Sequence, residues 1–171
     1  MAKAWEVPGL SGRARFREAA GRVVLTRWRE MMSFRDGTLL GEDIEELHAM
    51  RVSSRRLRAA MDAFAGAFPR KSFRPLVSQV KEITDVLGDA RDLDVAIERL
   101  TGILPEMRDD ERPGVEGLVA RYREERAAED PLLAALFARI DEEGFEERFV
   151  SYVTKHTGVR MARLDPRPPE A

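Results

Sequence analysis

The chain has 171 residues, of which 43% are hydrophobic and 35% charged, with a formal net charge of −2 and no cysteine. This length predicts one domain with a sizeable core, and the missing cysteine excludes disulfides, thiolate catalysis and cysteine-based zinc sites. The sequence has no apolar run of 18 residues and no signal-like start. We therefore expect a cytoplasmic protein that neither crosses a membrane nor is secreted.

The N-terminal part predicts an arm, a helix and a loop. Residues 1–10 have no helical periodicity and contain a proline and a glycine, which predicts a flexible arm. A first helix is expected from a cap at Ser11 to about Met32. Two glycines in residues 34–41 predict a loop that ends it.

The second expected helix begins at Asp43, whose carboxylate suits an N-cap, and runs to about Phe68, before Pro69. Its apolar residues fall in one stripe about 100° wide, which is the face that a helix buries. The stripe consists of Leu47, Met50, Leu57, Met61, Phe64 and Phe68.

A long third helix is expected with Pro75 in its first turn, continuing to about Leu100. Residues 102–117 are rich in charge, proline and glycine, which predicts a solvated connection. A fourth helix should then occupy about Val115–Glu129.

The pair Asp130-Pro131 has the residues of a cap and a first helical turn, which predicts a break and a fifth helix, with Gly144 as an interruption. The proline-rich end predicts a disordered tail over residues 159–171. No strand pattern appears, so we expect an all-α fold, an up-and-down bundle of four to five helices over residues 11–158.

The second helix carries a row of cationic side chains beside its apolar stripe: His48, Arg51, Arg55 and Arg58. Their spacing of three, four and three residues places them within about 80° of helix surface, roughly one turn apart. Residues 47–81 hold eight Lys or Arg and one Asp, so the rest of the chain is acidic. Neighbouring cations repel each other, so the row predicts either a bound anion or acids from another helix.

Phosphate is the anion that this row suits. Arginine offers phosphate oxygens a rigid fork of donors and keeps its charge, and histidine becomes more fully protonated beside a polyanion. A rise of about 5.4 Å per turn lets successive phosphates of an extended chain meet successive turns. Nucleic-acid binding normally adds exposed aromatic side chains, whereas the aromatic residues occupy core-like positions here: Trp28, Phe64, Phe68 and Phe73. RNA or another nucleic acid is therefore the alternative ligand.

Two motifs follow each other about 30 residues apart. The first is His48-Ala49-Met50-Arg51-Val52 with Arg55-Arg56-Leu57-Arg58, and the second is Leu87-Gly88-Asp89-Ala90-Arg91-Asp92-Leu93-Asp94-Val95. Together they resemble the CHAD family, the conserved-histidine α-helical domain. The resemblance implies a non-catalytic helical module that binds inorganic polyphosphate in a basic channel. It maps the binding positions onto His48, Arg51, Arg55, Arg56, Arg58 and Lys81.

The resemblance covers residues 11–100 best and differs from the family in one respect. Family members typically contain two four-helix halves, each with its own His-x-x-Arg helix, and this sequence has one such helix. An isologous homodimer is the simplest source of a second basic wall. We therefore expect a homodimer that binds polyphosphate or a similar polyanion. Binding of this ligand would also allow association with polyphosphate granules.

Other readings of the same residues remain open. Acids of the later helices could neutralise the basic row: Glu125, Glu129, Asp141, Glu142, Glu143, Glu146 and Glu147. Arg91, flanked by Asp89, Asp92 and Asp94, is expected to be a structural ion-pair centre.

Glu45 and His48 form one copy of the Glu-x-x-His pattern of di-iron bundles, which makes a metal-carboxylate enzyme a further alternative. Because Arg51 one turn onward would oppose a divalent cation, we predict no metal. The sequence has no Gly-rich phosphate loop, serine nucleophile elbow or paired-carboxylate site, so we also predict no cofactor and no catalytic residue.

Overall fold

The computed structural model describes residues 3–164, and within this range the protein is helical with no strand. The predicted all-α bundle is confirmed. Within residues 3–164 it contains five α-helices of at least 13 residues, one short α-helix and three 3₁₀ helices of three residues each. The α-helices are α1 (Phe16–Met32), α2 (Arg35–Leu40), α3 (Ile44–Ala63), α4 (Arg70–Ile103), α5 (Arg112–Glu142) and α6 (Phe145–Thr157). None of the described helices is both long enough and apolar enough to cross a membrane.

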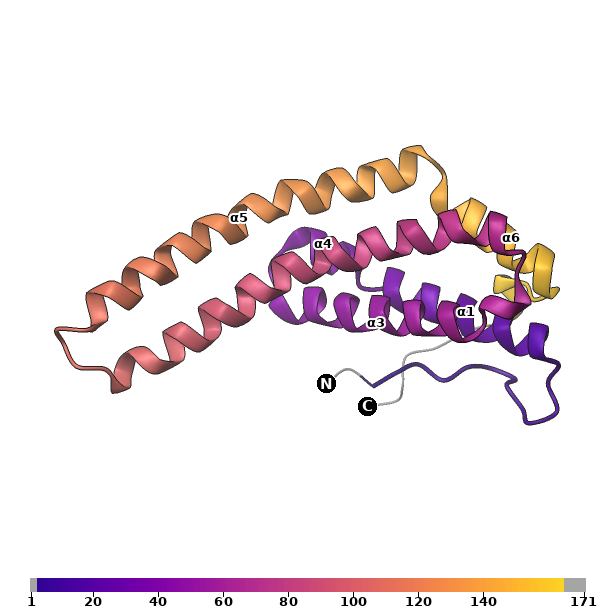
Figure 1. Ribbon diagram of the computed structural model, residues 1–171, viewed down its shortest axis with the longest axis horizontal. Coiled ribbons are helices and arrows are strands. Elements are labelled where there is room, and N and C mark those ends of the chain that lie inside the picture. The colour runs from indigo at the N-terminus through magenta and orange to yellow at the C-terminus, as the bar shows by residue number, and fades with distance from the viewer. Residues whose placement is uncertain (1–2, 165–171) are drawn as a thin grey trace.

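Helix α3 lies in the body of the bundle between α1 and α4 (Figure 1). Helix α1 also packs against α6, and α4 packs along α5. The connected ends of α4 and α5 project as a two-helix hairpin beyond the other helices (Figure 1). Helices α1 and α4 therefore cover two sides of α3. Polar side chains of α3 lie on the part of its surface that borders α4.

The core is built as the apolar spacing of α3 predicts. Leu47, Met50, Leu57 and Met61 are at most 2% exposed, and Phe68 is buried, whereas Phe64 is only half-buried. Burying an aliphatic side chain of this size contributes about 1.5–3 kcal/mol. The stripe of α3 thus holds the helix in a fixed rotation, and this rotation decides where its cations point.

Aromatic rings join the first and last helices of the bundle. The ring of Trp28 on α1 stacks on that of Phe149 on α6, with centroids 4.6 Å apart. Phe145 meets the same indole edge-on at 5.5 Å. All three side chains are fully buried, so α6 is held against α1 by apolar contact.

The predicted break at Asp130-Pro131 is wrong, because α5 continues through Pro131 to Glu142. A proline inside a helix costs about 3 kcal/mol through its missing amide and a clash with the preceding turn. Apolar residues directly after it are buried on one face and offset this cost: Leu133, Leu136, Phe137 and Ile140. The actual break comes at Gly144, whose φ of 58° is left-handed.

Other helix limits also differ from the predictions. Helix α4 begins at Arg70, so Pro75 is its sixth residue and does not lie in the first turn. Residues 34–41, predicted as a loop, contain α2. Helix α1 begins at Phe16 after Arg15, and the predicted cap at Ser11 is wrong.

The N-cap at Asp43 is confirmed, since its carboxylate accepts a hydrogen bond of 2.8 Å from the amide of Glu45. A side-chain acceptor at this position satisfies an amide that has no partner within the helix. The start of the helix that carries the basic row could therefore be read from the sequence.

Both ends of the described chain contact the bundle. The amide of Trp5 donates to Glu30 at 3.4 Å, and its carbonyl accepts from Arg27 at 2.6 Å. Val159 and Leu164 are buried. The flexibility of residues 1–10 and the disorder of residues 159–171 stay predictions, and residues 1–2 and 165–171 lie outside the described part.

Gly21 permits the close approach of α1 to the end of α6. Substitution of this glycine tests how tight the contact is. A Cβ at Gly21 would lie 2.3 Å from the Oγ1 of Thr157 and 2.9 Å from the Cβ of Val159. We expect Gly21→Ala to lower the free energy of unfolding by about 1–3 kcal/mol, as overpacking does, measured by urea denaturation. Gly117→Ala is the control, since an added Cβ meets nothing within 4 Å there, and alanine should stabilise α5 by about 0.5–1 kcal/mol. Equal stability of Gly21→Ala and the parent would contradict the tight contact.

Candidate functional site

The basic row predicted from spacing lies on α3 and faces the side on which α4 packs. Arg51 and Arg58 are half-buried, and Arg55 between them is exposed. Within residues 3–164 Arg55 has neither a hydrogen bond nor an ion pair. The middle of the row therefore presents an uncompensated guanidinium to solvent.

Two aspartates of α4 partly neutralise the ends of the row. Nη2 of Arg51 lies 3.3 Å from Oδ1 of Asp92, and Nη1 of Arg58 lies 3.8 Å from Oδ1 of Asp85. The side chains of Asp92 and Asp85 are 74% and 49% exposed. Exposed pairs of this kind contribute only about 0.2–1 kcal/mol, so a more highly charged anion can displace them.

Lys81 lies at the Arg58 end of the row. Its Nζ is 2.6 Å from Oδ2 of Asp85, the carboxylate that also meets Arg58. The structure thus brings the predicted position on α4 beside the predicted positions on α3. We call this surface the α3–α4 basic face, made of Arg51, Arg55, Arg58 and Lys81.

The two sequence motifs meet at this face. Arg51 of the first motif pairs with Asp92 of the second. A Cβ placed on Gly88 would lie 3.9 Å from Nε of Arg51, at ordinary contact distance. The structure therefore does not require glycine at position 88, because an alanine there would not clash with the Arg51 guanidinium. Helix α4 passes through Gly88 without a break.

His48 lies one turn before Arg51 and is half-buried. Its Nδ1 is buried and has no hydrogen-bond partner in the described part of the chain. The histidine is thus at the inner edge of the basic row, as its spacing predicts.

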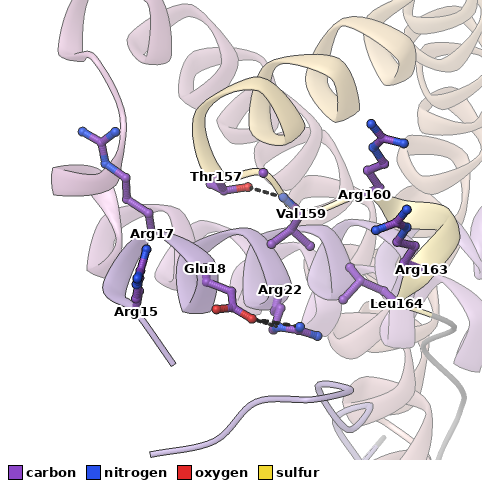
Figure 2. A pocket seen from close by; sticks show the side chains of 10 residues that line it. Arg15, Arg17, Glu18, Arg22, Thr157, Val159, Arg160, Arg163 and Leu164 are labelled. Carbon is purple, nitrogen blue, oxygen red and sulfur yellow. Dashed lines mark hydrogen bonds and ion pairs between the residues drawn. The ribbon is translucent and has the colours of Figure 1, made fainter. Parts of the chain in front are cut away.

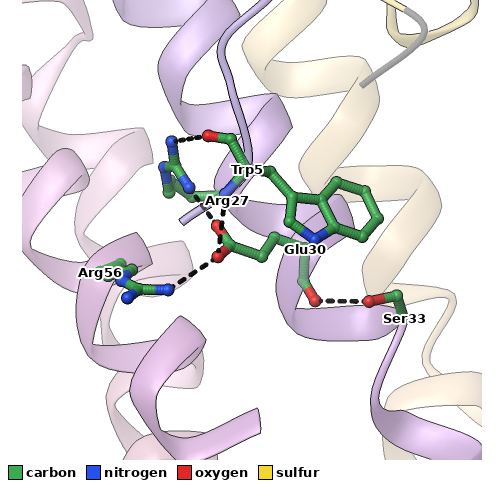
Figure 3. Close-up of polar contacts among 5 residues, drawn as sticks. All are labelled: Trp5, Arg27, Glu30, Ser33 and Arg56. Carbon is green, nitrogen blue, oxygen red and sulfur yellow. Dashed lines mark hydrogen bonds and ion pairs between the residues drawn. The ribbon is translucent and has the colours of Figure 1, made fainter. Parts of the chain in front are cut away.

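Arg56 points away from the basic face, about 100° around the helix from Arg55, and contacts α1. Its Nη1 donates to Oε1 of Glu30 at 2.9 Å (Figure 3). The side chain of Glu30 is 1% exposed and also bonds to Arg27 and to the amide of Trp5. A buried carboxylate needs such partners, so Arg56 has a structural role here, and its contact with polyphosphate stays a prediction.

The acids that oppose the row come from α4 and not from the later helices, among the described contacts. Asp141 bonds to Arg35, which lowers the pKa of that carboxyl, and Glu125 pairs with Arg121. Glu143 accepts from Gln79 at 2.9 Å. The alternative in which the acids of α5 and α6 neutralise the row is therefore wrong for these three residues.

The predicted ion-pair centre at Arg91 holds only in part: the charge of Arg91 opposes the rise that burial causes in the pKa of Asp94, but no direct ion pair of Arg91 is found among residues 3–164. Arg91 is 9% exposed, and its Nε and Nη1 have no hydrogen-bond partner within residues 3–164. Asp94 instead pairs with Nε of Arg126 on α5 at 2.9 Å. Burial raises the pKa of Asp94, and the charge of Arg126 opposes that rise. Sequence proximity could not reveal this partner, because it is 32 residues away.

A search for metal sites in the described part of the protein found no group of three or more His, Asp or Glu residues that could hold an ion. The Glu-x-x-His pattern at Glu45 and His48 therefore has no second set of ligands beside it among residues 3–164. Arg51, on the next turn, carries a positive charge at the place where further ligands would be needed.

The family assignment follows from a comparison of the whole sequence. A family model described as the CHAD domain matches residues 22–165. The chain therefore belongs to the CHAD family, as its two motifs imply, and the match extends well beyond residues 11–100. Comparisons with curated proteins and with solved structures found no match.

The contrasting surroundings of Arg55 and Arg56 give a test of their roles. Arg56→Met should lower the free energy of unfolding by about 1.5–3 kcal/mol, because it removes a charged hydrogen bond from buried Glu30. Arg55→Met should change it by less than about 0.5 kcal/mol, as at exposed sites. Denaturant unfolding of both variants measures the difference. Equal losses would contradict the structural role of Arg56.

Proposed function

We propose that this CHAD protein is a non-catalytic binding module for inorganic polyphosphate. The observation that carries the proposal is the α3–α4 basic face, on which three arginines one turn apart are opposed only by two exposed aspartates among the described residues. Membership of the CHAD family supports the same ligand.

The face suits a long polyanion better than a single small anion. Its cations follow α3 for about two turns and continue onto α4 at Lys81, so several phosphates can be met at once. Each contact releases counterions from the polymer, which makes binding favourable and salt-dependent. Asp85 and Asp92 would return to solvent when phosphate replaces them at the arginines.

Binding without catalysis is what these side chains can provide. Guanidinium and ammonium groups hold phosphates by charge and hydrogen bonds. At neutral pH they supply neither a nucleophile nor a general base, and a hydrolytic reaction would need one of these. We therefore propose that the protein holds the polymer and does not cleave it.

RNA is the second candidate ligand, and aromatic burial argues against it. Single-stranded nucleic acids are usually held by base stacking on exposed aromatic rings. Trp28, Phe68 and Phe73 are at most 6% exposed, and Phe64 is half-buried. A ligand made only of phosphates needs no such rings, so the face favours polyphosphate.

A charge-reversal pair tests the assignment. Arg51→Glu with Arg55→Glu should weaken binding of long-chain polyphosphate at least tenfold at ~150 mM salt, a regime in which exposed charges are partly screened. The plot of log affinity against log salt concentration should become less steep, by the amount expected from the loss of roughly two phosphate contacts. Fluorescence anisotropy of labelled polyphosphate measures both quantities.

The control for this pair is Arg108→Glu with Arg121→Glu, which makes the same change in net charge on the exposed hairpin of α4 and α5. It should leave affinity within about threefold, a change expected from net charge alone. Equal losses in the two variants would show that overall charge, and not the α3–α4 basic face, determines binding. RNA that displaces polyphosphate at equal phosphate concentration would favour the second candidate.

We further propose that two chains pair around the polymer, because one basic face can cover only one side of it. An isologous dimer would set the face of one chain opposite that of its partner. Like charges on the two faces resist approach until an anion lies between them. A cytoplasmic location beside polyphosphate granules would suit this assembly.

Light scattering at micromolar protein concentration tests the pairing. We expect the mass to double when polyphosphate is added at a few chains per protein, and the Arg51→Glu, Arg55→Glu variant should show no such change. A protein that stays monomeric at saturating polyphosphate would show that one basic face is sufficient, and would contradict the dimer while leaving the binding proposal intact.

A further inference from the structure

A second cluster of arginines surrounds a hollow of about 490 Å³ between the start of α1 and the segment that follows α6 (Figure 2). Thr157, Gly158, Val159 and Leu164 also line it. Its charged lining consists of five arginines and one glutamate: Arg15, Arg17, Arg22, Arg160, Arg163 and Glu18. We call this hollow the arginine pocket.

The one acid of the arginine pocket is already engaged. Oε1 of Glu18 accepts from Nε and Nη2 of Arg22 at 3.0 and 2.9 Å. Nη1 of Arg22 donates to the carbonyl of Pro8 at 2.9 Å. The other four arginines make no side-chain hydrogen bond or ion pair within residues 3–164. Four arginines thus line the hollow without a described acidic partner, in a chain whose formal net charge is −2.

The fold holds the two walls of the pocket in place. Gly158, with a φ of 75°, ends α6 and turns the chain back towards α1. Val159 and Leu164 are 9% and 2% exposed and anchor this returning segment. Arg160 and Arg163 lie between these anchors, so their backbone positions are fixed before any ligand binds. Such preorganisation lowers the entropic cost of binding.

The arginine pocket is separate from the α3–α4 basic face. Its residues lie at positions 15–22, at the start of α1, and 157–164, at the end of α6 and just after it, and none belongs to α3 or α4. Helix α1 packs against both α3 and α6, and none of the residues of the α3–α4 basic face lines the pocket. A ligand can therefore occupy the pocket without contacting Arg51 or Arg55.

We propose that the arginine pocket binds a compact ligand that carries two or more phosphate groups. Guanidinium forks match phosphate oxygens in pairs, and several of them on two walls can hold several phosphates. The volume lies in the range of small-molecule sites. A hollow of about 490 Å³ suits a compact ligand, in contrast to the long polymer proposed for the α3–α4 basic face, and the inference does not depend on that proposal.

Isothermal titration calorimetry of the full chain with two probes tests the pocket. Inorganic tripolyphosphate and ATP both carry several linked phosphate groups. The probe that binds more tightly shows whether the pocket prefers an inorganic or an organic phosphate compound. Arg17→Glu with Arg160→Glu changes one residue on each wall, and should weaken the better probe at least tenfold. Both side chains are exposed, so the variant should fold, which circular dichroism checks.

Arg108→Glu with Arg121→Glu is the matched variant, with the same change in net charge on the exposed hairpin of α4 and α5. It should leave affinity for the better probe within about threefold, since distant charges are screened at ~150 mM salt. Equal losses in the two variants, no loss in the pocket variant, or no binding of either probe would overturn the pocket. Failure of long-chain polyphosphate to bind at the basic face would leave this result unaffected.

Discussion

Repulsion among the cations of α3 is the constraint on which the rest of the structure depends. The apolar stripe of α3 fixes the rotation of the helix, and each cation then meets a different environment. Arg56 is directed at buried Glu30 of α1 and donates a hydrogen bond to its carboxylate. Arg51 and Arg58 reach exposed aspartates of α4 at 3.3 and 3.8 Å. Arg55 has no partner within the described chain. This gradation separates a structural cation from cations available to a ligand.

The fold class and the basic row could be predicted because both depend on residues close together in sequence. Helical spacing placed the α3 stripe in the core and the cations beside it, and the Asp43 cap located the start of the helix. Long-range contacts could not be predicted in this way. The pairing of Arg56 with Glu30 joins residues 26 positions apart. Spacing along the helix alone could not show that Arg56 has a structural role and that its neighbour Arg55 does not. The continuation of α5 through Pro131 likewise depends on burial of later residues, which overrides a local signal.

The arginine pocket escaped prediction for a related reason. Its two walls come from opposite ends of the chain, and neither wall alone has a pattern that differs from a solvated surface. Only the return of the chain after Gly158 places Arg160 and Arg17 at the lining of the same hollow. The molecule thus has two surfaces rich in arginine, the α3–α4 basic face and the arginine pocket, and they share no residue.

The most direct measurement of the central claim is nuclear magnetic resonance of the arginine Nε–H groups during titration with long-chain polyphosphate. We expect the signals of Arg51, Arg55 and Arg58 to shift together and their protons to exchange more slowly with water, because each guanidinium gains a phosphate partner. The signal of Arg56 should stay in place, since its partner is Glu30. Unchanged signals for Arg51 and Arg55 at saturating polyphosphate would contradict the assignment of the α3–α4 basic face as the binding site.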